Sequence, residues 1–147
     1  MVMIEWQTID LQWKKEVAAP MNCVDSGVGG HAYWHKLDQL VATCPLKIDR
    51  PQGSAHPRYP ALIYPFDYGY LEGTRSGDGD GIDVWVGSLP QKRVAGVICS
   101  VDTEQRDAEV KILLGCTPQE AREILQIHNA GGQAAILVER PVENGHW

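Results

Sequence analysis

The sequence lacks the patterns that mark several classes of protein. No stretch approaches the roughly 18 consecutive apolar residues of a membrane-spanning helix. The four cysteines form no C-x-x-C pair and no even framework, which argues against a zinc centre and against a disulfide scaffold. We therefore expect reduced, mostly buried thiols in a soluble, cytoplasmic protein. These cysteines are Cys23, Cys44, Cys99 and Cys116.

Positive charge is also scarce. The chain carries 13 Lys and Arg against 19 Asp and Glu, a net charge of −6. This balance argues against nucleic acid or an anionic membrane surface as a partner. A small anion can still bind where metal ions invert the local charge. The 147 residues, 44% of them apolar, suffice for one domain with its own core, so we expect a single domain over residues 1–147.

Apolar spacing predicts a helix at each end of a β-rich middle. Within residues 1–20, Trp6, Ile9, Trp13 and Val17 recur at three- and four-residue steps, which is typical of an amphipathic helix. Thr117-Pro-Gln-Glu has the form of a capping box with proline at the first helical position, which predicts a helix over residues 117–130.

Between these helices, short apolar runs broken by glycine and proline predict β-hairpins and loops over residues 31–114. A last strand is expected at 133–140. The run over 94–101 is almost wholly apolar, which is typical of a strand buried on both faces. The apolar runs expected in the β-rich middle are 33–34, 40–42, 46–48, 61–63, 82–86, 94–101 and 109–114.

The most informative segment is Asp78-Gly-Asp80-Gly-Ile-Asp83, with a second acidic pair at Asp102 and Asp107. Crowded carboxylates repel one another, and hard divalent cations such as Mg²⁺ neutralise them. The pattern indicates metal-assisted phosphoryl chemistry. Alone, D-G-D-G is more often a solvated turn. An EF-hand is excluded because the sequence places isoleucine at a ligand position and no glutamate at the required offset.

Three further segments extend the pattern. Asp78 to Val84 matches the signature D-[SGDN]-D-[PE]-x-D-x of family I inorganic pyrophosphatases except at Gly81. Tyr64-Pro-Phe-Asp-Tyr68-Gly-Tyr70 is similar to the family's Y-P-x-N-Y-G-F/Y, and Ile48-Asp-Arg50 to its V-D-R. Lys36 and Asp38 stand fourteen and twelve residues before Arg50, at the family's spacing for Lys and Glu. The chain thus resembles this family over residues 36–114.

The resemblance implies a role for each motif residue in hydrolysing pyrophosphate to two phosphates without a covalent intermediate. Asp78, Asp83, Asp102 and Asp107 would be ligands of Mg²⁺, and Asp38 a possible ligand or supporting residue. Metal ions would activate the attacking water. Asp80 would be the general base and Tyr68 would donate to the phosphate or water. The substrate would contact Lys36, Arg50, Tyr64, Tyr68 and Lys111.

Besides Gly81, three features depart from the family pattern. Glu109 stands where the family has lysine, with Lys111 on the same strand face one step further on. The C-terminal helix lacks the family's Tyr-Lys pair. An insertion between Arg50 and Tyr64 is expected to bring His56 or Arg58 over the pocket.

The fold that the resemblance implies is a small closed OB-type β-barrel with peripheral helices, in a homo-oligomer. Two alternatives stay open beside pyrophosphate hydrolysis. One is hydrolysis of another diphosphate or phosphoanhydride by the same metal cluster. The other is a noncatalytic barrel that binds metal or phosphate. Such a barrel would not need Asp80 as a base.

Overall fold

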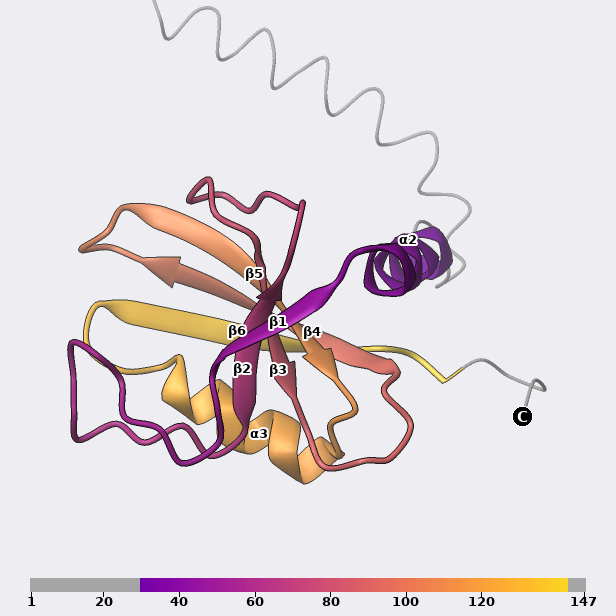
Figure 1. Ribbon diagram of the computed structural model, residues 1–147. Helices are drawn as coiled ribbons and strands as arrows, with labels where there is room; N and C mark the ends of the chain where they lie inside the picture. The colour runs from indigo at the N-terminus through magenta and orange to yellow at the C-terminus, as the bar shows by residue number, and fades with distance from the viewer. Residues whose placement is uncertain (1–29, 143–147) are drawn as a thin grey trace, which may run out of the picture. The chain divides into compact units, whose positions relative to one another are not determined.

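The computed structural model describes residues 30–142, and the helix predicted within residues 1–20 lies outside them. Two compact units divide the chain, residues 1–35 and 36–147. The single domain over residues 1–147 stays a prediction. Figure 1 shows the elements in chain order: α2 (Gly30–Thr43), β1 (Leu46–Arg50), β2 (Asp67–Leu71), β3 (Ile82–Val86), β4 (Val94–Asp102), β5 (Asp107–Leu114), α3 (Pro118–Ile127) and β6 (Gln133–Glu139).

Within residues 30–142, six strands form one sheet in the order β1-β2-β3-β5-β4-β6. Only β3 and β5 pair in parallel, and the other neighbours are antiparallel. A mainly β fold with helices is therefore confirmed. The closed barrel is not: in the described part of the chain β1 and β6 are the two edges of the sheet and do not pair with each other.

The core lies between the central strands and α3. Trp85 on β3, Ile98 on β4 and Leu113 on β5 are almost fully buried, and α3 contributes Ala121 and Ile124. The helix α3 lies beside β6, as Figure 1 shows. Burial of these side chains is the main favourable contribution to the fold, and it fixes the strand ends that carry the acidic residues.

Most predicted elements are confirmed. The strand at 82–86 has the predicted bounds, and those at 94–101, 109–114 and 133–140 differ at their ends by one or two residues. The capping box forms as expected: the Glu120 amide donates to Thr117 Oγ1 at 3.1 Å, and the Thr117 amide donates to Glu120 Oε1 at 2.9 Å. The helix ends at Ile127, earlier than the predicted 130.

Within residues 31–71 one prediction is wrong and one strand is missed. Residues 30–43 form a helix and not hairpins, because Trp34, Leu37 and Val41 recur at three- and four-residue steps. The strand β2 forms where no apolar run predicts one. Its Gly69 lies against β1 so closely that a β-carbon would overlap the Lys47 carbonyl oxygen. The pairing of β1 with β2 thus depends on that glycine.

The cysteines are only partly as expected. Cys44, Cys99 and Cys116 are free, but only Cys116 is buried. Cys23 lies outside the described residues.

Candidate active site

The loop between β2 and β3 holds the first acidic cluster in a tight turn. Asp78 Oδ1 accepts hydrogen bonds from Ser76 Oγ at 2.6 Å and from the Asp80 amide at 2.9 Å. Gly79 between the two acids has φ +88°, a backbone conformation that glycine adopts without strain. The Ser76 hydroxyl also holds the pKa of Asp78 below its usual range. Asp78 is therefore ionised and kept in a fixed orientation.

A hollow of about 480 Å³, called the acidic hollow below, brings six of the predicted residues together. Carboxylates from the loop and β3 form one part of its wall, and Arg50 of β1 with two tyrosines forms another. Arg50 Nη1 lies 3.5 Å from the Tyr64 hydroxyl. The lining residues are Asp49, Arg50, His56, Tyr64, Tyr68, Tyr70, Asp78, Asp80, Gly81 and Asp83.

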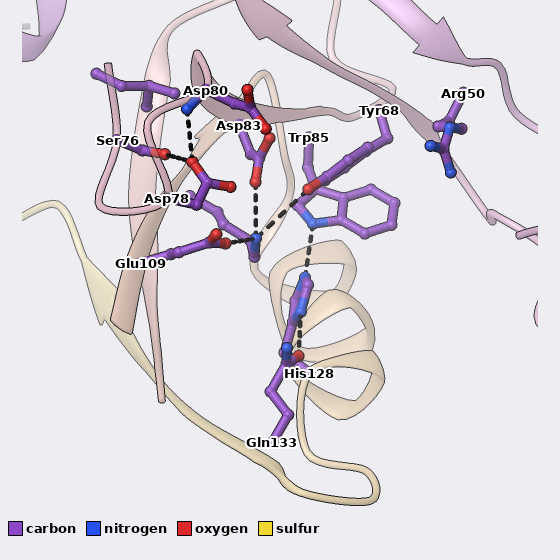
Figure 2. A network of polar contacts seen from close by, with 12 residues as sticks. Arg50, Tyr68, Ser76, Asp78, Asp80, Asp83, Trp85, Glu109, His128 and Gln133 are labelled. Carbon is purple, nitrogen blue, oxygen red and sulfur yellow. Dashed lines mark hydrogen bonds and ion pairs between the residues drawn. The ribbon is translucent and has the colours of Figure 1, made fainter. Parts of the chain in front are cut away.

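The centre of the polar network is Lys111, whose side chain is 5% exposed. Its Nζ lies 2.8 Å from Asp83 Oδ2 and 2.6 Å from Glu109 Oε2, and it donates to the Tyr68 hydroxyl at 3.4 Å. Figure 2 shows Asp83 and Glu109 on one side of Tyr68 and Trp85, and Arg50 on the other side. An ammonium has three donors, so this set of acceptors satisfies it.

Sheet geometry explains this placement. Glu109 and Lys111 are two residues apart on β5 and so share a face. Asp83 comes from β3, which is the parallel neighbour of β5, with Val84 opposite Ile112. Burial alone would lower the pKa of Lys111, but the Asp83 and Glu109 carboxylates outweigh burial and raise it. Burial raises the pKa of Glu109. The lysine therefore stays protonated.

A second hollow of about 660 Å³ adjoins the first, because His56, Tyr64 and Tyr68 line both. We call it the aromatic hollow. His56, one of the two insertion residues expected over the pocket, is thus present, whereas Arg58 lines neither hollow. The remaining lining residues of the aromatic hollow are Tyr59, Leu62, Trp85, Asp102, Glu104, Lys111, Ile127, His128, Ala130, Gly131, Gly132 and Gln133.

His128 is a buried polar residue that sequence analysis does not single out. Trp85 Nε1 donates to His128 Nε2 at 3.0 Å, and His128 Nδ1 contacts Gln133 Oε1 at 2.8 Å. Because indole nitrogen can only donate, the proton of the neutral imidazole is on Nδ1 and points to Gln133. Burial lowers the pKa of His128 to about 4. No spacing motif signals this residue; it follows directly after α3, at the position that caps the helix.

The remaining predicted residues lie elsewhere. Lys36 on α2 is exposed and lines neither hollow. Both Asp38 oxygens accept from Arg140, at 2.8 Å each, so this carboxylate neutralises an arginine. Asp102 lines the aromatic hollow, with Oδ1 accepting from the amides of Glu104 and Gln105 in the turn. Asp107 is opposite Asp102 in the ladder and lines neither hollow.

The donor set of the acidic hollow fits a hard divalent cation. Three carboxylates from the signature segment line it, and Mg²⁺ is usually held by one or two carboxylates together with waters and substrate phosphates. Asp78 and Asp80 are exposed to this space. Within residues 30–142, no group of three or more His, Cys, Asp or Glu side chains is arranged so that it could hold a metal ion.

Within the described residues no helix is long and apolar enough to cross a membrane.

Comparison with known proteins gives the same family as the motifs. The family model described as Inorganic Pyrophosphatase matches residues 41–137, well over half of the chain. An inorganic pyrophosphatase of Sulfolobus acidocaldarius is 37% identical over 60 residues, covering 35% of each chain. One of Aeropyrum pernix is 35% identical over 75 residues, covering 46% of this chain and 39% of that relative. The chain thus spans little more than a third of the length of these curated relatives.

The fold has a solved counterpart. The crystal structure of an inorganic pyrophosphatase from Neisseria gonorrhoeae superposes with a TM-score of 0.51 at 20% sequence identity. The match covers 65% of this chain and 81% of that one. At this identity the likeness concerns the fold alone. The match of the family model over residues 41–137 shows that the chain belongs to the inorganic pyrophosphatase family.

Proposed function

We propose that this protein hydrolyses inorganic pyrophosphate to two phosphates with Mg²⁺ as cofactor. One observation carries the proposal. In a chain of this family, the three signature carboxylates line the same hollow as an arginine and two tyrosines. The reaction requires little covalent chemistry from a protein, because positioning and electrostatic stabilisation provide most of the catalysis of phosphoryl transfer.

The carboxylates of the acidic hollow are proposed to bind the metal ion and to accept a proton. Asp78 and Asp83 are the carboxylates that would hold the metal, and Asp102 and Asp107 are further candidates on the family pattern. Bound Mg²⁺ would supply Lewis-acid polarisation of a phosphoryl oxygen and lower the pKa of a bound water. Asp80, exposed beside them, is proposed to accept the proton of the attacking water.

The substrate is proposed to contact the opposite part of the wall. Arg50 would pair with phosphoryl oxygens through its planar guanidinium. Tyr68 would donate a hydroxyl hydrogen bond, because burial raises its pKa and keeps it protonated. Tyr64 would line the acidic hollow beside Arg50. Lys36 stays part of the proposal on its sequence spacing alone, since it is exposed outside both hollows. Lys111 would act through Asp83 and Tyr68.

A second candidate substrate is a phosphoanhydride with a neutral organic group. The aromatic hollow favours it, because its charged lining residues are two acids, Asp102 and Glu104, and one lysine that is already paired. The low pKa of His128 keeps that imidazole neutral. Such a lining repels a second phosphate and tolerates an uncharged ring.

The test is phosphate release from pyrophosphate, nucleoside triphosphates and a short polyphosphate, each with and without Mg²⁺. Metal-dependent release from pyrophosphate supports the first candidate, and release only from a nucleoside triphosphate supports the second. The control is Asp80→Asn, expected to lower turnover by on the order of 10²-fold or more. Equal turnover in parent and Asp80→Asn would refute the proposed base, and no release from any substrate would favour a binding module.

A cytoplasmic location and a homo-oligomeric state are also proposed, on the family resemblance. Neither nucleic acid nor a membrane is proposed as a partner, in line with the net charge of −6. Size-exclusion chromatography with light scattering would test the oligomeric state, and a monomer would contradict it.

A further inference from the structure

Lys111 is a buried lysine that is paired with two carboxylates, Asp83 and Glu109. Its side chain is 5% exposed and belongs to β5, the neighbour of β3. A buried ammonium is strongly destabilising unless it is paired and hydrogen-bonded. The Lys111 ammonium is paired with the Asp83 and Glu109 carboxylates and also donates to the Tyr68 hydroxyl oxygen.

The same ammonium occupies one of the oxygens that a metal ion would use. Asp83 Oδ2 lies 2.8 Å from Lys111 Nζ, at hydrogen-bonding distance. A divalent ion on that oxygen would be within a few ångströms of a fixed positive charge, with little water between them to screen it. Binding of the ion at Asp83 then requires either displacement of the lysine or acceptance of this repulsion.

Glu109 makes displacement costly. Its Oε2 lies 2.6 Å from Nζ, and its side chain is 13% exposed. Because Glu109 and Lys111 share one face of β5, the strand keeps their two side chains next to each other. The pair is therefore built into the sheet, unlike the exposed loop acids Asp78 and Asp80.

We propose that Lys111 is a resident cation of this site, which occupies Asp83 in the place of a divalent ion and is held there by Glu109. The substrate-free chain consequently binds fewer divalent ions, or binds them more weakly, than its carboxylates would allow. The inference rests on the proposed metal-dependent function for its setting, but its test measures metal binding without substrate.

The experiment titrates Mn²⁺ into the full-length chain by isothermal calorimetry, without substrate. In Lys111→Met we expect one additional ion per chain, or affinity tighter by on the order of tenfold, the scale on which one nearby charge shifts a carboxylate equilibrium. The matched control is Lys47→Met, which removes an exposed lysine of β1 and leaves this site intact. It should bind Mn²⁺ like the parent.

Two double variants test whether the additional Mn²⁺ binding of Lys111→Met takes place at Asp83. Lys111→Met/Asp83→Asn should lose it, since Asp83 is the carboxylate that the lysine releases. Lys111→Met/Glu109→Gln removes one charge of each sign, which spares the fold, and should still bind Mn²⁺ more tightly than the parent. A gain that survives Asp83→Asn, or Mn²⁺ binding by Lys111→Met equal to that of the parent, would overturn the proposal.

Thermal unfolding, measured with and without Mn²⁺, shows whether Lys111→Met is folded. If the variant unfolds without metal, its recovery by Mn²⁺ supports the proposal, and failure of Mn²⁺ to recover either Lys111→Met or the charge-balanced double variant refutes it. Phosphate release by the parent is measured separately. Its absence would refute the proposed function, while the Mn²⁺ titrations would still decide the role of Lys111.

Discussion

Acidification should destabilise this protein through His128. Its Nε2 accepts the Trp85 indole hydrogen at 3.0 Å and its Nδ1 faces Gln133 Oε1 at 2.8 Å. Protonation of Nε2 would set two N–H donors against each other in a buried place. The fold therefore favours the neutral imidazole, and burial lowers the pKa of His128 to about 4, whereas the unfolded chain has the ordinary value of 6.5.

The sign of the effect follows from these two pKa values. Above pH 6.5 the histidine is neutral in both states and costs nothing. Between pH 6.5 and about 4 only the unfolded state takes up a proton, so the free energy of unfolding falls as pH falls. A gap of about 2.5 units at 1.36 kcal/mol per unit amounts to roughly 3 kcal/mol when complete.

The assay is urea unfolding, followed by circular dichroism, at several pH values from about 7.5 to 4.5. The matched variant is His128→Gln, which keeps an acceptor for Trp85 and a donor for Gln133 but does not titrate. The parent should lose about 2 to 3 kcal/mol more than the variant over this range. Parallel pH profiles for parent and variant would refute the reasoning, because other titrating groups contribute to both.

Three further changes have expected outcomes. Arg50→Gln should lower kcat/KM for pyrophosphate by about 10- to 100-fold, the scale of one hydrogen bond to a charged group, while Lys47→Gln on the same strand leaves it unchanged; equal values for parent and Arg50→Gln would exclude the arginine from substrate binding. Thr117→Ala should lower the free energy of unfolding by about 1 kcal/mol in urea, since the N-cap bond of α3 is lost, and an unchanged midpoint would contradict this. Cys116 should resist alkylation in the native protein at mildly alkaline pH, because burial raises its pKa to about 12, whereas the partly exposed Cys44 and Cys99 react; mass spectrometry showing Cys116 modified first would oppose it.

Local patterns predict much of this protein because the physics behind them is local. The α3 capping box involves Thr117 and Glu120, three residues apart, so the sequence alone specifies it. Apolar runs predict β3, β4 and β5 because those strands are buried in the centre of the sheet. The acidic turn from Asp78 to Asp83 indicates the family through the spacing of its carboxylates, which is a property of one short segment.

The elements that sequence analysis misjudges depend on competing signals or on two segments at once. Residues 30–43 combine a helical period with aromatic pairs that also suit strands. The polar strand β2 forms because Gly69 lets β1 approach closely, and that approach involves both strands. The closed barrel is absent from the described chain for the same reason, since closure depends on how β1 and β6 meet and not on either strand's sequence.

The candidate site also contains residues that the sequence predicts and residues that only the folded structure brings together. Motif spacing and the family resemblance predict Arg50, Tyr64, Tyr68 and the acids Asp78, Asp80 and Asp83, which the structure does bring to one hollow. Only the parallel register of β3 and β5 places Lys111 on Asp83, and only the packing of α3 on β3 makes His128 the partner of Trp85. Charge and periodicity are properties of a sequence, but which buried charge meets which partner is decided by contacts between distant segments, and these exist only in the folded chain.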